Sequence, residues 1–220
     1  MIVITGASDG LGLEVAKLYK QAGKKVVNVS RRKSEAADVQ ILHDLTKGDE
    51  IKAAAEEVLE QGDALEVLIN CAGVFTGEPL GSITEDEIKR TMATNVKAPI
   101  LLVSNLIERI KQDGTDIVNV ASTVGTKATS EFVYGPSKWA VRAFSNNLQQ
   151  ELKNTSSRVI TFCPGGFKSK LFEKATGHDN TGDGSEWMKA EDLAVCMKQL
   201  LDLPKNMEVS EIISNRKISK

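Results

Sequence analysis

Short apolar runs alternate along the chain with longer segments in which apolar residues recur every three or four positions. The short runs are rich in β-branched residues and almost continuous in apolar character, which is typical of strands buried on both faces of a parallel sheet. The longer segments have the periodicity of amphipathic helices. We predict strands at 2–5, 25–30, 39–45, 65–73, 115–122, 157–165 and 207–213, and helices at 11–21, 47–61, 84–112, 136–153 and 191–201.

The order of these elements predicts the fold class. A repeated strand–helix order is typical of a doubly wound parallel sheet with helices on both faces, so we expect a Rossmann-like α/β fold of about seven strands. The 220 residues fit one domain, and no internal repeat divides them. We therefore expect a single domain at 1–220, in which the long helix begins at a capping box formed by Thr84 and Glu87.

The composition excludes several classes of protein. Hydrophobic residues make up 41% of the chain and charged residues 26%, which excludes a mainly disordered chain. A formal net charge of −2 gives no basic surface for nucleic acid. No apolar run reaches the roughly 18 residues of a membrane helix, and the N-terminal segment lacks the basic stretch and cleavage site of a signal peptide. We expect a soluble, cytoplasmic protein with no nucleic-acid or membrane partner.

The three cysteines, Cys71, Cys163 and Cys196, are widely spaced and odd in number. They form no CxxC pair, and no histidine stands at metal-ligand spacing from them, so the sequence indicates neither a disulfide framework nor a zinc site. We expect free thiols and no metal centre.

A glycine-rich turn, TGASDGLG, follows the first expected strand and leads directly into a helix. Its glycines, Gly6, Gly10 and Gly12, permit a tight turn whose N–H groups, with the helix N-terminus, can face a pyrophosphate. The spacing differs from the commonest dinucleotide fingerprint, G-x-G-x-x-G. No Gly-Lys-Ser/Thr follows, which disfavours a nucleoside triphosphatase.

This turn resembles the cofactor loop of the short-chain dehydrogenase/reductase family. The likeness continues in order along the chain with Asp44-Leu45, Asn70-Cys71-Ala72-Gly73, Asn95, Ser122, Tyr134-x-x-x-Lys138 and Pro164-Gly165. Each motif is modest alone, and together they are highly specific. The resemblance implies a nicotinamide dinucleotide bound by Gly6, Ser8, Asp9, Gly10, Leu11, Gly12, Asp44, Leu45, Asn70, Ala72, Gly73, Tyr134, Lys138, Pro164, Gly165, Phe167 and Ser169.

The end of the second expected strand bears on the choice of cofactor. NAD sites usually carry an acidic residue there for the ribose 2′-hydroxyl, whereas this chain has Ser30-Arg31-Arg32. A guanidinium offers phosphate oxygens a planar fork of donors, which favours NADP (NADPH) over NAD. Asp9 in the glycine-rich turn would oppose this preference if it pointed toward the phosphate.

Tyr134 and Lys138 stand four residues apart, with Pro136 between them in a position that a helix tolerates only in its first turn. Both side chains then share one helix face near its positive end. An adjacent ammonium group and the helix N-terminus favour the phenolate, so we expect the pKa of Tyr134 to be lowered toward working pH. Ser122 follows the fifth expected strand, at the edge where parallel sheets bind ligands.

The resemblance also implies a role for each reacting residue. Ser122 binds and polarises the substrate oxygen, and Tyr134 is the acid/base on that oxygen. Lys138 holds the nicotinamide ribose and tunes Tyr134, while Asn95 organises a water that relays the proton. Ser169 stands where the family has Thr and keeps its hydroxyl.

The implied substrate is a small carbonyl or alcohol compound, covered by a short lid at about 166–188. His178 lies in this lid, and we expect it to be a solvated loop residue. The resemblance further implies a homodimer or homotetramer that pairs through the helices expected at 84–112 and 136–153.

Two other functions remain open at this level. One is a catalytically idle NADP-binding sensor or regulatory protein, for which a complete set of Ser122, Tyr134 and Lys138 is not required. The other is a sugar-nucleotide epimerase or dehydratase, which usually has a larger C-terminal substrate region than follows Gly166 here.

Overall fold

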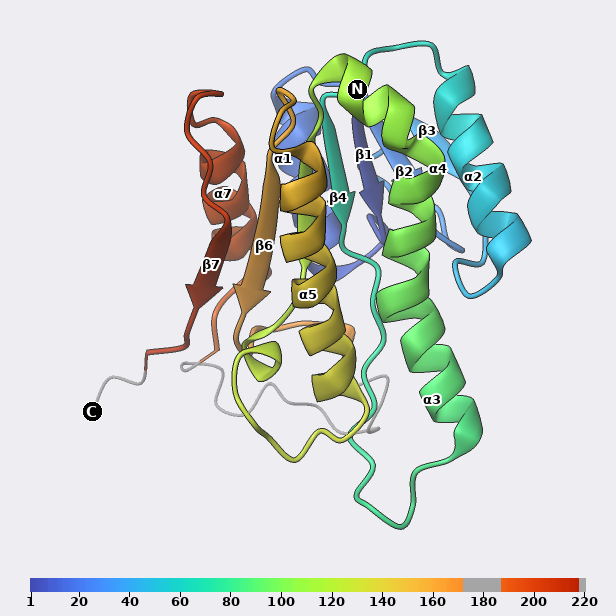
Figure 1. Ribbon diagram of the computed structural model, residues 1–220, viewed down its shortest axis with the longest axis vertical. Coiled ribbons are helices and arrows are strands. Elements are labelled where there is room, and N and C mark those ends of the chain that lie inside the picture. Colours follow the sequence, from blue (N-terminus) through green and yellow to red (C-terminus); the bar gives the residue numbers. More distant parts are fainter. Residues whose placement is uncertain (172–186, 218–220) are drawn as a thin grey trace.

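Seven parallel strands form the centre of the protein, and helices cover both faces of the sheet (Figure 1). The computed structural model describes residues 1–171 and 187–217. Within them the strands are β1 (Ile2–Thr5), β2 (Val26–Val29), β3 (Val39–Ile41), β4 (Val67–Asn70), β5 (Asp116–Val120), β6 (Val159–Pro164) and β7 (Glu211–Ser214). Their order across the sheet is β3-β2-β1-β4-β5-β6-β7. This arrangement confirms the Rossmann-like α/β fold class expected from the sequence.

The helices lie in two layers, each packed on one face of the sheet through its own apolar cluster. Helices α1 (Gly10–Gln21) and α7 (Ala190–Leu201) form one layer, and α2 (Gly48–Glu60), α4 (Ala98–Asp113) and α5 (Tyr134–Leu152) form the other. Helix α3 (Glu85–Met92) continues the line of α4 beyond the edge of the sheet (Figure 1). None of the helices in the described part of the chain is long and apolar enough to cross a membrane.

The sheet positions a site at one edge. β1 pairs with β2 on one side and with β4 on the other, so the loops that leave β1 and β4 diverge from neighbouring strands. Because the strands are parallel, their carboxyl ends and the loops that follow them share one edge. Ligands of doubly wound sheets bind in the crevice at this point.

The helix expected at 84–112 is not continuous. The capping box of Thr84 and Glu87 is present, but a π-helical turn at Ala93–Lys97 separates α3 from α4. Within this turn Asn95 accepts a hydrogen bond from the Val74 N–H at 2.9 Å and donates one to the Val74 carbonyl at 2.9 Å. These bonds hold the helix against the loop after β4, and π-turns of this kind are frequent at functional sites in proteins generally. The prediction of one continuous helix was wrong at this point.

Two predicted strands end three or four residues earlier than expected. β3 ends at Ile41 and not at 45, because the chain then leaves the sheet and exposes Leu42. β4 ends at Asn70 and not at 73, since the next residues bond to a side chain of β1: the Cys71 and Ala72 N–H groups both donate to Thr5 Oγ1 at 3.0 Å.

Candidate active site

A cavity of about 1280 Å³ opens at the carboxyl edge of the sheet. Its walls come from the loops after β1 to β6, from the first turn of α5 and from one side of the α3–α4 line. Most of the residues expected at the site line it: Gly6, Ser8, Asp9, Gly10, Leu11, Arg31, Arg32, Asp44, Leu45, Ala72, Gly73, Ser122, Tyr134, Lys138, Pro164, Phe167 and Ser169. Residues that are far apart in sequence therefore share one chamber.

The glycine-rich turn is packed too tightly for other side chains. Gly6 has a φ of 74°, and a Cβ on it would lie 2.9 Å from the Ala72 Cα. A Cβ on Gly12 would lie 2.5 Å from the Gly6 carbonyl oxygen, so Gly12 packs α1 against the turn and does not line the cavity. The turn thus brings main-chain groups and the N-terminus of α1 to the cavity wall, which is the cradle that a pyrophosphate needs.

The end of β2 places basic groups beside this turn. Arg32 Nη2 lies 3.4 Å from Asp9 Oδ2, while the other oxygen of Asp9 accepts the Gly10 N–H at 2.9 Å as the N-cap of α1. Ser30 is buried, and its hydroxyl donates to the Arg32 carbonyl. The donors available here suit a dinucleotide with an extra phosphate.

Asp44 also lines the cavity. Its Oδ1 accepts hydrogen bonds from the Thr46 N–H at 3.0 Å and from the Thr46 hydroxyl at 2.9 Å. The main-chain bond is the largest of the effects that lower the pKa of Asp44 below its usual value, and the charge of Arg31 acts in the same direction. Asp44 therefore stays ionised and keeps acceptor oxygens in the cavity wall.

Ser122, Tyr134 and Lys138 meet in the same cavity. All three are largely buried, and the Ser122 hydroxyl donates to the Pro164 carbonyl at 3.4 Å. Lys138 Nζ donates to the Val120 carbonyl at 2.8 Å and lies 5.5 Å from the centre of the Tyr134 ring. Gly125 permits this arrangement, because a Cβ on it would lie 2.8 Å from the main-chain carbon of Lys138.

Burial controls the acid–base properties of this group. It raises the pKa of Tyr134 to about 12, although the polar side chain of Ser122 acts in the other direction. It also lowers the pKa of Lys138 to about 8. The expectation of a lowered Tyr134 pKa was thus wrong for the protein alone. The ammonium group of Lys138 lies over the ring of Tyr134 and donates its hydrogen bond to the Val120 carbonyl. Desolvation of the phenolate outweighs the favourable effect of Ser122 on the pKa of Tyr134.

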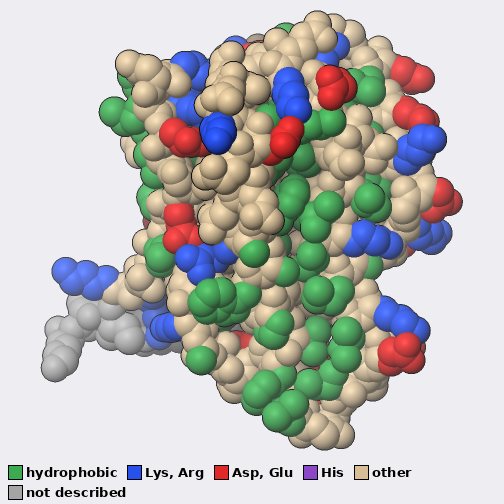
Figure 2. Space-filling model, in the orientation of Figure 1, with side chains coloured by type: hydrophobic (Ala, Val, Ile, Leu, Met, Phe, Trp, Pro, Cys, Tyr) green, Lys and Arg blue, Asp and Glu red, His purple; other side chains and the backbone are tan. Residues whose placement is uncertain are grey.

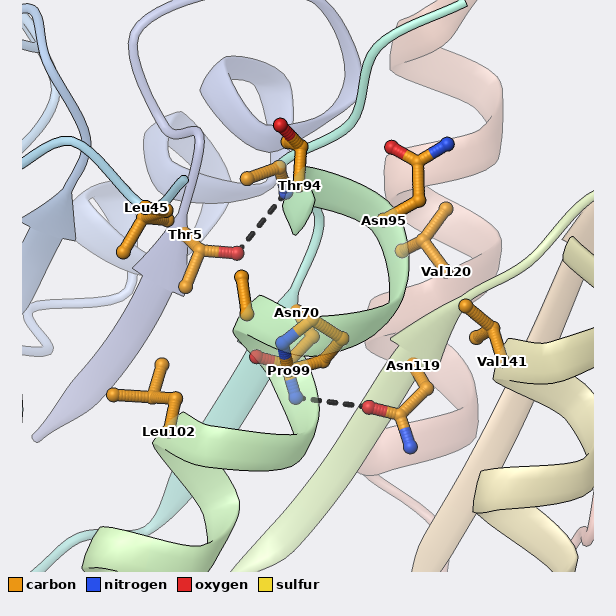
Figure 3. A pocket seen from close by; sticks show the side chains of 12 residues that line it. Thr5, Leu45, Asn70, Thr94, Asn95, Pro99, Leu102, Asn119, Val120 and Val141 are labelled. Carbon is orange, nitrogen blue, oxygen red and sulfur yellow. Dashed lines mark hydrogen bonds between the residues drawn. The ribbon is translucent and has the colours of Figure 1, made fainter. Parts of the chain in front are cut away.

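Asn70 and Asn95 lie behind the cavity, and both line a separate chamber of about 10 Å³. Asn70 donates to Asn119 Oδ1 at 2.8 Å in the wall of this chamber (Figure 3). Asn95 donates its second amide hydrogen to Ser137 Oγ at 3.0 Å, so both hydrogens are used within the protein. These residues join β4, β5 and the π-turn to the helix that carries Tyr134.

The segment after β6 has only its two ends in the described part of the chain. Gly165 donates to the Ser214 carbonyl at 2.7 Å and does not line the cavity. Phe167 and Met188 form a parallel bridge, so the two ends of the expected lid lie side by side. The residues at 172–186, which include His178, lie outside the described residues.

Sequence reasoning missed part of the cavity wall. The cavity is also lined by His43 and Thr46, by Cys71, Val74 and Phe75, and by a stripe on α3, the π-turn and α4. This stripe consists of Asp86, Lys89, Arg90, Met92, Ala93, Thr94, Val96, Lys97, Ile100 and Leu101. Its spacing of three and four residues was visible in the sequence, but the same spacing is expected of any helix face.

The fold and the cavity are those of a dinucleotide-binding α/β protein. A family model described as short chain dehydrogenase matches residues 1–180, and the chain belongs to this family of nicotinamide-dependent oxidoreductases. An uncharacterized oxidoreductase of Staphylococcus saprophyticus is 28% identical, with 97% of this chain and 94% of the relative covered.

Solved structures give the same result. A short-chain dehydrogenase from Sphingobium yanoikuyae in complex with NADPH has a TM-score of 0.80 at 26% identity, with 91% of this chain and 83% of that chain covered. An alcohol dehydrogenase from the archaeon Thermococcus sibiricus, complexed with 5-hydroxy-NADP, has a TM-score of 0.87. At 21% identity over 98% of this chain and 95% of that chain, this second likeness concerns the fold alone.

Proposed function

We propose that the protein is an NADP(H)-dependent oxidoreductase that interconverts a small carbonyl compound and the corresponding alcohol. The observation that carries this proposal is the meeting of Ser122, Tyr134 and Lys138 in one cavity with the glycine-rich turn. A sensor that only binds a dinucleotide needs the turn and has no use for a buried hydroxyl pair beside a buried lysine.

Each of the three residues has a task in this reaction. The dihydronicotinamide supplies a hydride to the carbonyl carbon when the cofactor is bound. Ser122 donates a hydrogen bond to the substrate oxygen, on which negative charge develops. Tyr134 gives its phenolic proton to that oxygen, and the ammonium group of Lys138 stabilises the phenolate that remains. In the reverse direction Tyr134 accepts the proton of the alcohol.

Tyr134 must regain a proton after each reduction, and we propose that this proton passes near Asn95. Tyr134 and Lys138 are largely buried, so the proton needs a path through the protein. We include in the proposal that Asn95 organises a water for this relay. Because both amide hydrogens of Asn95 already bond to Val74 and Ser137, that water would be held by oxygen atoms of the π-turn.

The preference for NADP(H) rests on the end of β2. Position 30 holds a serine where NAD sites usually have an acidic residue. The Ser30 hydroxyl is hydrogen-bonded to Asn28 Oδ1 and to the Arg32 carbonyl. Arg31 and Arg32 both line the cavity and are exposed, so a 2′-phosphate can reach both. The complex of the Sphingobium protein with NADPH supports a nicotinamide cofactor for this chain as well.

A homodimer or homotetramer is also part of the proposal. Hydrophobic side chains run down the face of the molecule that α4 and α5 form (Figure 2). Trp139 on α5 is 46% exposed. An apolar surface of this kind is typical of a protein interface.

We also propose a cytoplasmic location. The cysteines at 71, 163 and 196 are all unpaired thiols, which fits a reducing compartment.

The proposal is tested by NADPH oxidation with a panel of aldehydes, ketones and quinones, and by NADP⁺ reduction with alcohols. Turnover of at least one carbonyl or alcohol supports it. Tight NADPH binding without turnover of any compound would favour the regulatory sensor instead.

A further inference from the structure

An acidic residue lines the cavity beside the two arginines that we propose bind the 2′-phosphate of the cofactor. Asp9 lines the cavity next to the ends of β1 and β2, and its Oδ2 lies 3.4 Å from Arg32 Nη2. The side chain of Asp9 is 29% exposed and that of Arg32 is 61% exposed. The pair therefore lies at the cavity mouth, where a ligand can reach it.

The position of Arg32 is set by its main chain. The Arg32 carbonyl accepts hydrogen bonds from Asn28 Nδ2 at 2.9 Å and from Ser30 Oγ at 2.6 Å, and the Arg32 N–H lies 3.3 Å from Ser30 Oγ. Asn28 is fully buried and Ser30 is 9% exposed. The turn is thus anchored in the sheet, and the long side chain of Arg32, which is 61% exposed, has room to exchange one anion for another.

Arg31 has a different environment. It has no ion pair or hydrogen bond with the residues that the structure describes, and its charge acts on Asp44 from a longer distance. The two neighbouring arginines are therefore not equivalent. Arg31 can bind a phosphate without losing another interaction, whereas Arg32 must first break its ion pair with Asp9.

We propose that Asp9 competes with the 2′-phosphate of NADP(H) for Arg32, which makes Asp9 a determinant of cofactor selectivity and leaves Arg31 as the main phosphate ligand. This inference rests on the proposed binding of a nicotinamide dinucleotide in the cavity. NAD(H) has no 2′-phosphate, so the competition affects only one of the two cofactors. The present pair thus lowers the selectivity that two arginines would otherwise produce.

The test measures dissociation constants for NADPH and NADH by titration and takes their ratio as the selectivity. Asp9→Asn keeps the N-cap of α1, because Asn caps as well as Asp does, and it removes the charge that holds Arg32. A new charge-assisted hydrogen bond to the phosphate should raise the selectivity for NADPH about tenfold. Effects of Asp9 on the pyrophosphate are common to both cofactors and cancel in the ratio.

Asp9→Asn is also made in two variants that each lack one arginine. They separate competition of Asp9 for Arg32 from simple repulsion between Asp9 and the 2′-phosphate. In an Arg32→Gln background, Asp9→Asn should change the selectivity no more than about threefold, since only a screened repulsion is removed. In the matched Arg31→Gln background, Arg32 is still present and the gain of about tenfold should persist. Thermal unfolding of each variant checks that the fold is kept.

Several results would overturn the inference. An unchanged selectivity in Asp9→Asn would show that Asp9 does not act on the phosphate. An equal or larger gain in the Arg32→Gln background would show that Asp9 acts by repulsion alone and not by holding Arg32. If the unmodified protein binds neither dinucleotide, the proposed function fails and the inference falls with it, which is distinct from binding with unchanged selectivity.

Discussion

Asn95 and Val74 are joined by two hydrogen bonds that together use both main-chain groups of Val74. The Val74 N–H donates to Asn95 Oδ1, and Asn95 Nδ2 donates to the Val74 carbonyl, each at 2.9 Å. Asn95 Nδ2 also donates to Ser137 Oγ, which itself donates to the Tyr134 carbonyl at 2.7 Å. One side chain thus connects the loop after β4 with the turn of α5 that carries the proposed acid.

Asn95→Leu should lower the free energy of unfolding by at least about 2 kcal/mol, because it leaves partly buried main-chain groups of Val74 without partners. Urea unfolding measures this change. Asn105 is an exposed residue of α4 whose side chain bonds only within its own helix, so Asn105→Leu is the control and should cost less than about 0.5 kcal/mol. Equal effects of the two substitutions would contradict the role given to Asn95.

Tyr134→Phe should reduce turnover by about 100-fold or more, since general acid catalysis typically contributes about 10²–10⁴-fold. NADPH should still bind, because the ring and its edge contact with Phe75 remain. Steady-state turnover and NADPH titration are measured on the same preparation. The chain's other tyrosine, Tyr19, is buried in α1, and Tyr19→Phe should leave turnover within a few-fold. Survival of turnover in Tyr134→Phe would show that another group is the acid.

The buried Lys138 should make stability depend on pH. Its pKa falls from 10.5 to about 8 on folding, so the folded protein loses this proton at a lower pH than the unfolded chain does. Between about pH 8 and 10.5 the unfolded state binds more protons, and the free energy of unfolding rises with pH through this group. Below about pH 8 the penalty for the buried charge is fully present.

Lys138→Met removes the titrating amino group and keeps much of the side-chain volume. Comparing this variant with the unmodified protein therefore isolates the contribution of Lys138 to the pH dependence of stability. The stability of the unmodified protein relative to Lys138→Met should rise by up to about 3 kcal/mol between pH 7 and 10, at about 1.4 kcal/mol for each pKa unit. Thiols and tyrosines away from Lys138 are common to both proteins and cancel. The charge of Lys138 also acts on Cys71, but burial raises the pKa of that thiol to about 11, so the folded protein keeps it protonated over most of this range. A difference independent of pH would mean that Lys138 is not desolvated as the structure indicates.

Light scattering at micromolar concentration should find a dimer or a tetramer. Trp139→Glu on the exposed side of α5 should shift the population toward smaller species, because it puts a charge into the proposed apolar interface. Val195 on α7 is also exposed, at 44%, but belongs to the opposite helix layer. Val195→Glu should leave the α4–α5 pairing intact. A monomeric unmodified protein would refute the assembly.

The order of elements and the fold class could be read from the sequence. Buried parallel strands have continuous β-branched runs, and amphipathic helices have a regular period, so both are local properties of the chain. The glycine-rich turn at Gly6 and the pair of Tyr134 and Lys138 were equally visible. Their spacing is fixed by main-chain geometry, which a few neighbouring residues determine.

The tertiary structure decided the properties that depend on residues distant in sequence. The π-turn at Asn95 depends on Val74, a neighbour 21 positions away along the chain, and the pairing of Asp9 with Arg32 joins residues 23 positions apart. The pKa of Tyr134 was expected to fall from its local partners, but burial raises it to about 12. Desolvation is set by every chain segment packed around a group, whereas a sequence motif specifies only that group's nearest neighbours along the chain.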